Sequence, residues 1–183
     1  MKSWELVRHI GQDKEKQYCR GETLSYTLAQ KRLFKTLVVP VLLYGCQTWK
    51  MDMGDDQRID VFHNKCLRRI LKIKWQDHVT TREFLEKEET KFLSEEVKRR
   101  RWRMIGHVLR QNRNSHTNIA LSWTPEGKRK RGRPKTTWRR TVERERNSAG
   151  WRTWDEARAA AANRENWRHS VEALCATRHK EGR

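Results

Sequence analysis

The sequence of 183 residues contains little of what a large hydrophobic core or a membrane span requires. Hydrophobic residues make up 35% of the chain and charged residues 36%, which is too polar for one large core but too apolar for full disorder. The longest apolar run, from Leu37 to Cys46, includes Pro40 and is about half as long as the roughly 20 residues that cross a bilayer. These shortages argue against membrane insertion and favour amphipathic helices around a modest core.

Cysteine and acidic residues are scarce as well. The four cysteines are far apart and form no C-x-x-C pair, which is typical of reduced thiols in a cytosolic or nuclear protein. The first thirty residues contain several charges and no apolar signal core, so we do not expect secretion. The 23 acidic residues face 42 Lys and Arg, which gives a net charge of +19. Such a surplus favours a polyanionic partner, most commonly the phosphate backbone of RNA or DNA.

Strand-type alternation persists nowhere in the sequence, which predicts an all-α protein. Residues 1–21 are polar and aperiodic, and we expect them to form a divergent, poorly ordered segment. A helical bundle is expected over residues 22–110, followed by a basic linker over 111–135 and a small C-terminal helical part over 136–183.

Apolar residues at helical spacing predict the first two helices. A stripe from Leu24 to Leu42 indicates a helix that Pro40 kinks or splits. A second stripe predicts an amphipathic helix over residues 56–73. The expected buried face of this second helix consists of Ile59, Phe62, Cys66, Ile70 and Ile73.

Polar start signals predict four further helices, because a side-chain oxygen at the cap accepts hydrogen bonds from the first backbone amides. The last of these helices is expected to be long, with an apolar stripe that runs from Trp154 to Leu174. The expected caps are Thr80, Ser94, Thr136 or Thr137, and Thr153.

No catalytic centre is expected. The Asp55-Asp56 pair after Met53-Gly54 resembles the metal-binding turn of template-directed polymerases, in which paired carboxylates hold two magnesium ions. That turn lies between two apolar strands, whereas here polar and charged residues flank the pair and Asp56 stands where a helix N-cap belongs. A helix start is therefore the favoured interpretation.

No metal site is expected either. His63 and Cys66 have the i, i+3 spacing that could share a metal ion, but no second ligand pair stands at a finger or knuckle spacing. We expect a packed Cys66 thiol beside a half-exposed imidazole.

The strongest functional signal is the basic segment around Arg131-Gly132-Arg133-Pro134, which matches the core of an AT-hook. In that motif an extended backbone enters the minor groove of A·T-rich duplex, and the two arginines lie along its floor. The same composition suits a nuclear import signal, and a solvated linker is the alternative. We expect Arg131 and Arg133 to contact the groove. Their expected phosphate-binding neighbours are Lys128, Arg129, Lys130 and Lys135.

Tryptophan next to arginine indicates two further candidate sites, because indole rings stack on unpaired bases while guanidinium groups hold phosphate. Trp102 falls near the apolar face of its helix and is expected in the core, whereas base stacking and core packing stay equally open for Trp138. The secondary candidates for nucleic-acid contact are Arg99, Arg100, Arg101, Trp138, Arg139 and Arg140.

Several of these segments together resemble the region after the polymerase palm in non-LTR (LINE-type) retrotransposon endonuclease/reverse transcriptase proteins. The most specific are the Arg-Arg-Trp-Arg-Met-Ile-Gly-His-Val-Leu-Arg run over 100–110 and the Arg-Gly-Arg-Pro-Lys-Thr-Thr-Trp run that ends at Trp138. The resemblance runs in order from about residue 22 to 177, which is most of the chain. Its segments are 42–49, 66–71, 100–110, 130–138, 153–157 and 166–168.

The resemblance implies that residues 22–110 are thumb-like, with the helix over 56–73 gripping primer–template, and that the basic tail holds template RNA or target DNA. The family's endonuclease, fingers and catalytic palm are missing from this sequence. We therefore expect a nucleic-acid-binding fragment without catalysis or cofactor, with Mg²⁺ belonging only to the full-length parent enzyme. The basic segment at 128–135 predicts a nuclear location after cytoplasmic synthesis.

Three alternatives stay open. The chain could be part of an active RNA-directed DNA polymerase or endonuclease that uses Asp55 and Asp56. It could be a genomic remnant without a selected function. It could also be a protein-interaction module that self-associates through an exposed apolar helix face.

Overall fold

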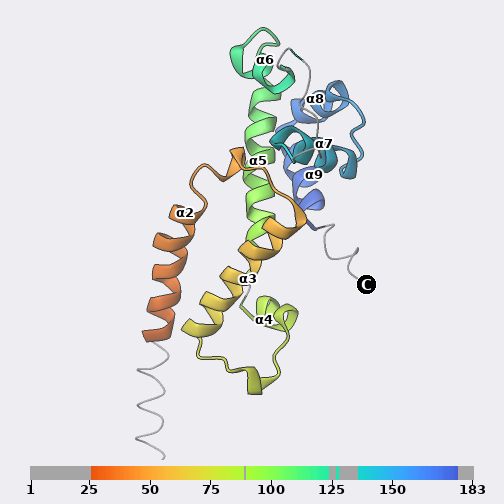
Figure 1. Cartoon of the computed structure of the whole chain (residues 1–183). Coiled ribbons are helices and arrows are strands. Elements are labelled where there is room, and N and C mark those ends of the chain that lie inside the picture. Colours follow the sequence, from red (N-terminus) through yellow and green to blue (C-terminus); the bar gives the residue numbers. More distant parts are fainter. Residues whose placement is uncertain (1–25, 89, 124–126, 128–135, 177–183) are drawn as a thin grey trace, which may run out of the picture. The chain divides into compact units, whose positions relative to one another are not determined.

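The computed structural model describes residues 26–88, 90–123, 127 and 136–176. The chain divides into two compact units: Met1–Tyr44 with Asn64–Val79, and Gly45–His63 with Thr80–Arg183. Every regular element in the described part is helical (Figure 1), which confirms the all-α expectation. Across these same ranges, no helix is both long and apolar enough to span a membrane.

The N-terminal helix accommodates Pro40 without splitting. Helical residues 26–33 continue into a π-helical segment, Phe34–Val38, and then into α2, Val39–Leu42. Proline lacks a backbone N–H and its ring crowds the preceding turn. The wider π turn just ahead of Pro40 relieves this conflict locally.

Most of the stripe predicted for this helix is exposed rather than buried. Leu28, Leu37 and Val41 are 57%, 61% and 77% exposed, whereas Phe34 is buried. The periodicity was therefore sufficient to predict the helix but not what covers its apolar face.

Helix α3, Met53–Ile70, begins earlier than the sequence predicts. Asp52 caps it, because its Oδ1 accepts a hydrogen bond from the Asp55 N–H at 2.9 Å and its own N–H donates to Asp55 Oδ2 at 3.4 Å. Asp55 and Asp56 therefore lie in the first turn, where the positive end of the helix dipole favours carboxylates. The helix-start interpretation of the Asp-Asp pair is confirmed, with the cap at Asp52 instead of Asp56.

The buried face of α3 differs from the expected one. Asp60, His63 and Leu67 are buried, whereas Ile59 is only half-buried. The cause is a polar tertiary contact: the Asp60 carboxylate accepts hydrogen bonds from the Ser94 N–H at 2.9 Å and from its hydroxyl at 2.7 Å. Ser94 was expected to cap the next helix, but α5, Leu93–Leu109, begins before it and has no side-chain cap of its own at Phe92.

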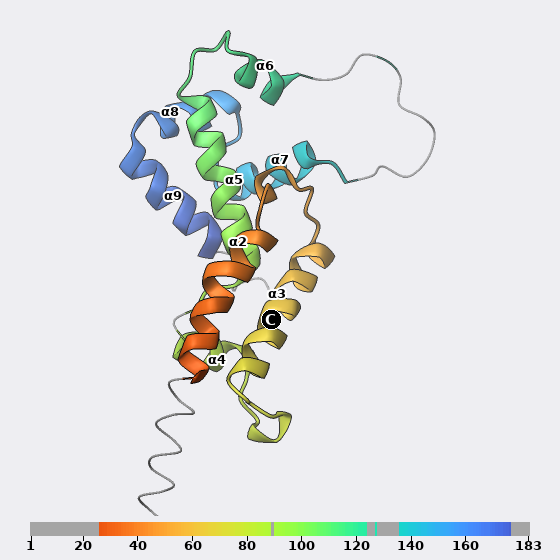
Figure 2. The same cartoon turned by 90° about the vertical axis from the view of Figure 1, so that its left-hand side faces the viewer.

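The core of the second unit is built by α5, α7 (Trp138–Ser148), α8 (Trp154–Ala162) and α9 (Arg164–Ala176). Helices α5 and α9 lie side by side in both views (Figures 1 and 2) and contact each other along their length. The buried members of this core are Trp102, Ile105, Leu109, Val142, Ala157, Ala161, Trp167, Val171, Leu174 and Cys175.

Three tryptophans form the centre of this core. The ring centroids of Trp151 and Trp167 are 4.8 Å apart in a stacked pair, and Trp102 lies 5.4 Å from the first and 5.9 Å from the second. The Trp167 indole N–H also donates to the Trp102 carbonyl at 3.1 Å. The core placement predicted for Trp102 is confirmed, and Trp167, which belongs to the stripe predicted from Trp154 to Leu174, is buried beside it.

The single long helix predicted from Trp154 onward is wrong, because the chain breaks it at Asn163. This residue has an extended backbone, with φ −92° and ψ 115°. Its Oδ1 accepts hydrogen bonds from the N–H groups of Glu165 and Asn166 at 2.9 and 3.1 Å, so Asn163 caps α9. The predicted apolar stripe survives the break, since Ala157 and the later stripe residues are buried.

The remaining elements are short. The capping box predicted at Thr80 and Glu83 is present and opens α4, Thr81–Lys87. Helix α6, His116–Ser122, lies inside the segment expected to be a linker. Two 3₁₀ turns, Cys46–Thr48 and Trp75–Asp77, complete the described elements.

Candidate nucleic-acid interface

The AT-hook-like residues cannot be placed in this interface. Lys128, Arg129, Lys130, Arg131, Arg133 and Lys135 all lie outside the described residues. The described part of the chain nevertheless contains the secondary candidates, and it separates them by burial and by partner.

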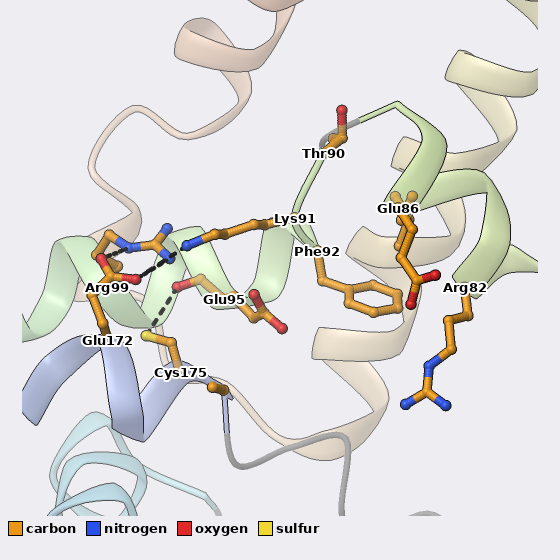
Figure 3. A pocket seen from close by; sticks show the side chains of 11 residues that line it. Arg82, Glu86, Thr90, Lys91, Phe92, Glu95, Arg99, Glu172 and Cys175 are labelled. Atoms are coloured by element: carbon orange, nitrogen blue, oxygen red, sulfur yellow. Dashed lines mark hydrogen bonds and ion pairs between the residues drawn. The ribbon is translucent and has the colours of Figure 1, made fainter. Parts of the chain in front are cut away.

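Arg99 belongs to an ion-pair network between α5 and α9. Its Nη1 lies 2.6 Å from Glu96 Oε2 and its Nε lies 2.7 Å from Glu172 Oε1. Lys91 reaches the same Glu172 at 3.2 Å, so both cations point at one carboxylate (Figure 3). The hydrogen bond from Arg99, together with that from Lys91, lowers the pKa of Glu172 to about 2. With its side chain only 8% exposed, Arg99 holds helices together instead of facing solvent.

A cavity of about 500 Å³ lies beside this network, between α4, α5 and α9 (Figure 3). Its lining includes Cys175, whose Sγ donates to the Glu95 carbonyl at 3.6 Å. Burial raises the pKa of this thiol to about 11, so it stays protonated at neutral pH and is a poor nucleophile. The cavity mixes carboxylates with cations, which makes it unsuited to a phosphate chain.

Arg101 is buried more completely than Arg99 and is also paired with a carboxylate. It is 1% exposed, and its Nη1 lies 2.5 Å from Glu145 Oε1 on α7. The other oxygen of Glu145 accepts the Trp102 indole N–H at 2.8 Å. In this structure neither Arg99 nor Arg101 presents a guanidinium group to a phosphate. Arg100 keeps a 36% exposed side chain and pairs with Glu96 at 2.9 Å.

Two of the three candidate side chains on α7 are also engaged in hydrogen bonds within the fold. The Trp138 indole N–H donates to the Gln47 carbonyl at 2.7 Å and the side chain is half-buried. Arg139 donates to the carbonyls of Leu121, at 3.2 Å, and of Trp123, and so secures the end of α6. Arg140 is exposed.

A different group of basic residues converges on one cavity. Arg103, His107 and Arg110 come from α5 and its C-cap, and Arg164 and Arg168 come from α9. They surround about 470 Å³, a volume within the usual range of ligand pockets. We call this cavity the arginine cleft; its lining residues are Arg103, His107, Arg110, Arg164, Trp167 and Arg168.

The arginine cleft is electrostatically unbalanced. No carboxylate from the described ranges lines it, although it gathers four guanidinium groups. Burial, and then repulsion from Arg164, lowers the pKa of Arg110. Arg110 is nevertheless fixed in position, because its Nη1 donates to the Ala161 carbonyl at 3.1 Å. Guanidinium groups that gather in one cavity with no carboxylate among its described lining residues favour the binding of an anion between them.

The cleft residues could have been found from sequence by helical spacing. Arg103, His107 and Arg110 stand at i, i+4 and i+7, and Arg164 and Arg168 stand at i and i+4, so each set occupies one helix face. The prediction followed the consecutive run Arg99–Arg101 instead, and consecutive residues on a helix point in different directions.

The acidic and metal candidates all lie on α3. Asp55 and Asp56 are on a helix, not at the tip of a hairpin. His63 is buried and Cys66 is half-buried, so the expected burial of the two is reversed. Over the residues that the structure describes, no group of three His, Cys, Asp or Glu side chains is placed to hold a metal ion.

Comparison with known proteins shows a distant similarity. Over 120 residues the chain is 27% identical to an uncharacterized transposon-derived protein from Caenorhabditis elegans. The similarity covers 62% of this chain and 42% of the relative, so the chain spans well under half of that protein. No family model matches the sequence. No solved structure matches it either. The similarity is consistent with a transposon-related origin.

Proposed function

We propose that this chain is a nucleic-acid-binding part of a non-LTR retrotransposon reverse transcriptase, without a polymerase or endonuclease centre of its own. The observation that carries the proposal is the arginine cleft, which gathers four guanidinium groups without a carboxylate from the described residues. The net charge of +19 supplies the long-range attraction to a polyanion. The transposon-derived relative supports the origin in a mobile element.

In this proposal the chain holds RNA or DNA by its phosphates. Arg103, Arg164 and Arg168 provide exposed cations on the described surface, and Arg131 and Arg133 add groove contacts from the basic segment. Phosphate contacts fix position on the nucleic acid without reading its sequence, which suits a part that positions a template or target for chemistry elsewhere. The segment at 128–135 also directs the protein to the nucleus.

The test is a gel-shift competition among single-stranded RNA, duplex DNA and RNA–DNA heteroduplex. We expect binding to at least one of the three with submicromolar affinity at low salt. The variant Arg131→Ala/Arg133→Ala should weaken duplex binding, and should do so more on A·T-rich DNA if the AT-hook interpretation holds. If the chain binds none of the three, the proposed function is contradicted.

The absence of catalysis has its own test. In a primer-extension assay with Mg²⁺ we expect no nucleotide incorporation above background. Incorporation that Asp55→Asn/Asp56→Asn abolishes would instead support the polymerase alternative. Size-exclusion chromatography without nucleic acid tests self-association through the exposed face that includes Leu37 and Val41.

A further inference from the structure

We propose that the arginine cleft binds the terminal phosphate of a nucleic-acid strand in preference to the phosphodiesters within a strand. The ligand is a phosphomonoester on a chain end. The inference rests on the proposed function and deepens it, because it assigns one part of the nucleic acid to one cavity.

The charge of the cleft suits a terminal phosphate better than an internal one. A phosphodiester carries one negative charge, whereas a phosphomonoester carries about −1.5 to −2 at neutral pH and offers three acceptor oxygens. The cleft concentrates four guanidinium groups, and none of its described lining residues is acidic. Helix α9 begins at Arg164, so the positive end of its dipole adds to the same field. This is more positive charge than one diester needs, and it suits a dianion.

Two residues that line the cleft, Arg110 and Trp167, are already hydrogen-bonded within the fold. Trp167 is 3% exposed and its indole N–H is already bonded to the Trp102 carbonyl. Because its ring is buried in this structure, it offers no exposed face on which successive bases could stack. Arg110 is held by the Ala161 carbonyl at 3.1 Å, so at least one cation is positioned before any ligand arrives, and less side-chain entropy is lost on binding.

Carboxylates line the cavity next to the cleft. The neighbouring cavity of about 550 Å³ shares Arg103 and Arg168 but is also lined by Glu165 and Glu172. A strand that continued along the α5–α9 groove would place its next phosphate near these carboxylates. Repulsion there disfavours a continuous backbone on this path and favours a strand that ends in the cleft.

The experiment uses the whole chain and fluorescence anisotropy. Three labelled oligonucleotides of one sequence carry a 5′-phosphate, a 3′-phosphate or hydroxyl ends only, and a circular oligonucleotide has no end. The cleft variant is Arg103→Ala/Arg168→Ala, and Arg82→Ala/Arg152→Ala is the charge-matched control. All four of these side chains are exposed, and neither control residue lines the cleft.

We expect one phosphorylated end to bind at least about tenfold more tightly than the hydroxyl and circular forms, a difference of about 1.4 kcal/mol. The cleft variant should lose this preference while the control variant keeps it. Equal affinity of the wild-type chain for all four ligands would overturn the inference but leave the proposed function intact. A preference that the cleft variant keeps would also overturn it. If the wild-type chain binds none of the four, the inference fails, and the gel-shift competition among RNA, duplex DNA and heteroduplex decides separately whether the proposed function fails as well.

Discussion

The two halves of α5 use arginine in opposite ways. In the first half, Arg99 and Arg101 are 7% and 1% exposed and are bonded to carboxylates. Toward the other end, Arg103 is exposed and lines a cleft with Arg110, where the described residues supply no carboxylate. The same residue type therefore stabilises the fold at one end and leaves a positive field at the other. Burial and the nearest partner, not the density of charge in the sequence, distinguish the two.

The largest effect should come from removing the carboxylate that Arg101 needs. Glu145→Ala leaves the guanidinium of Arg101 buried without its ion-pair partner and removes the acceptor of the Trp102 indole N–H. We expect a loss of about 3–5 kcal/mol in the free energy of unfolding, measured by urea denaturation. The double variant Arg101→Met/Glu145→Leu, which removes both charges, should recover much of this loss. If both variants lower the free energy of unfolding equally, the unpaired charge of Arg101 is not the cause of the loss.

The next effect tests the close approach of α5 and α9. A Cβ at Gly106 would lie 2.6 Å from Cε2 of Trp167, too close for two carbon atoms. We expect Gly106→Ala to cost about 1–3 kcal/mol by overpacking, although alanine favours a helix by about 1 kcal/mol over glycine. At Gly54, the matched helical control, the nearest atom is the end of the Asp52 side chain at 3.2 Å. Because that oxygen, Asp52 Oδ1, also caps α3 and has to move by only a few tenths of an ångström, Gly54→Ala should lower the midpoint of thermal unfolding much less than Gly106→Ala.

The cleft arginines should behave in the opposite way to Arg101. Arg103→Ala/Arg168→Ala removes exposed side chains that have no carboxylate partner within the described part of the chain. We expect the free energy of unfolding to change by no more than about 0.5 kcal/mol per substitution. In a plot of log affinity against log salt, the slope should become less steep by about 1 for each phosphate that the variant no longer neutralises. A variant that unfolds easily would show that these residues stabilise the fold instead.

The smallest effect concerns Glu172. Its pKa is lowered from 4.5 to about 2 by Arg99 and Lys91, so the folded state favours the ionised carboxylate. The resulting stability is fully present above pH 4.5 and is lost as the pH falls through that range toward about 2. Because the side chain is 46% exposed, solvent screening keeps the contribution small. Glu172→Gln should flatten the dependence of stability on pH across this window.

Local signals in the sequence were sufficient for much of the fold. The capping box at Thr80 and the apolar stripe of the C-terminal helices depend on neighbours within a few residues, and both are present in the structure. The break at Asn163 could also have been predicted, since asparagine is a strong helix cap. The apolar stripe continues across the break, and it favoured the prediction of a single helix. The Asp60–Ser94 contact was not readable, because it joins two helices that no local pattern relates.

Nucleic-acid binding stays a prediction, and the structure shows only which of the candidate arginines are already paired within the fold. A surplus of positive charge indicated phosphate binding, but the sequence could not show that Arg99 and Arg101 would find carboxylates on α9 and α7. Those partners lie 73 and 44 residues away along the chain. Helical periodicity is sufficient to predict that Arg103 and Arg110 share one face of α5. That this face lies against α9 could be known only from the tertiary structure.

The most direct measurement of the central claim is the affinity for nucleic acid as a function of salt. Each phosphate that the chain neutralises releases condensed counterions, which contributes a slope of about −0.9 for duplex DNA and −0.7 for single strands to the plot of log affinity against log salt. If about six phosphates are engaged, the affinity should fall about a thousandfold between about 50 and 200 mM salt. Binding that hardly changes over that range would contradict a mechanism based on arginine and phosphate.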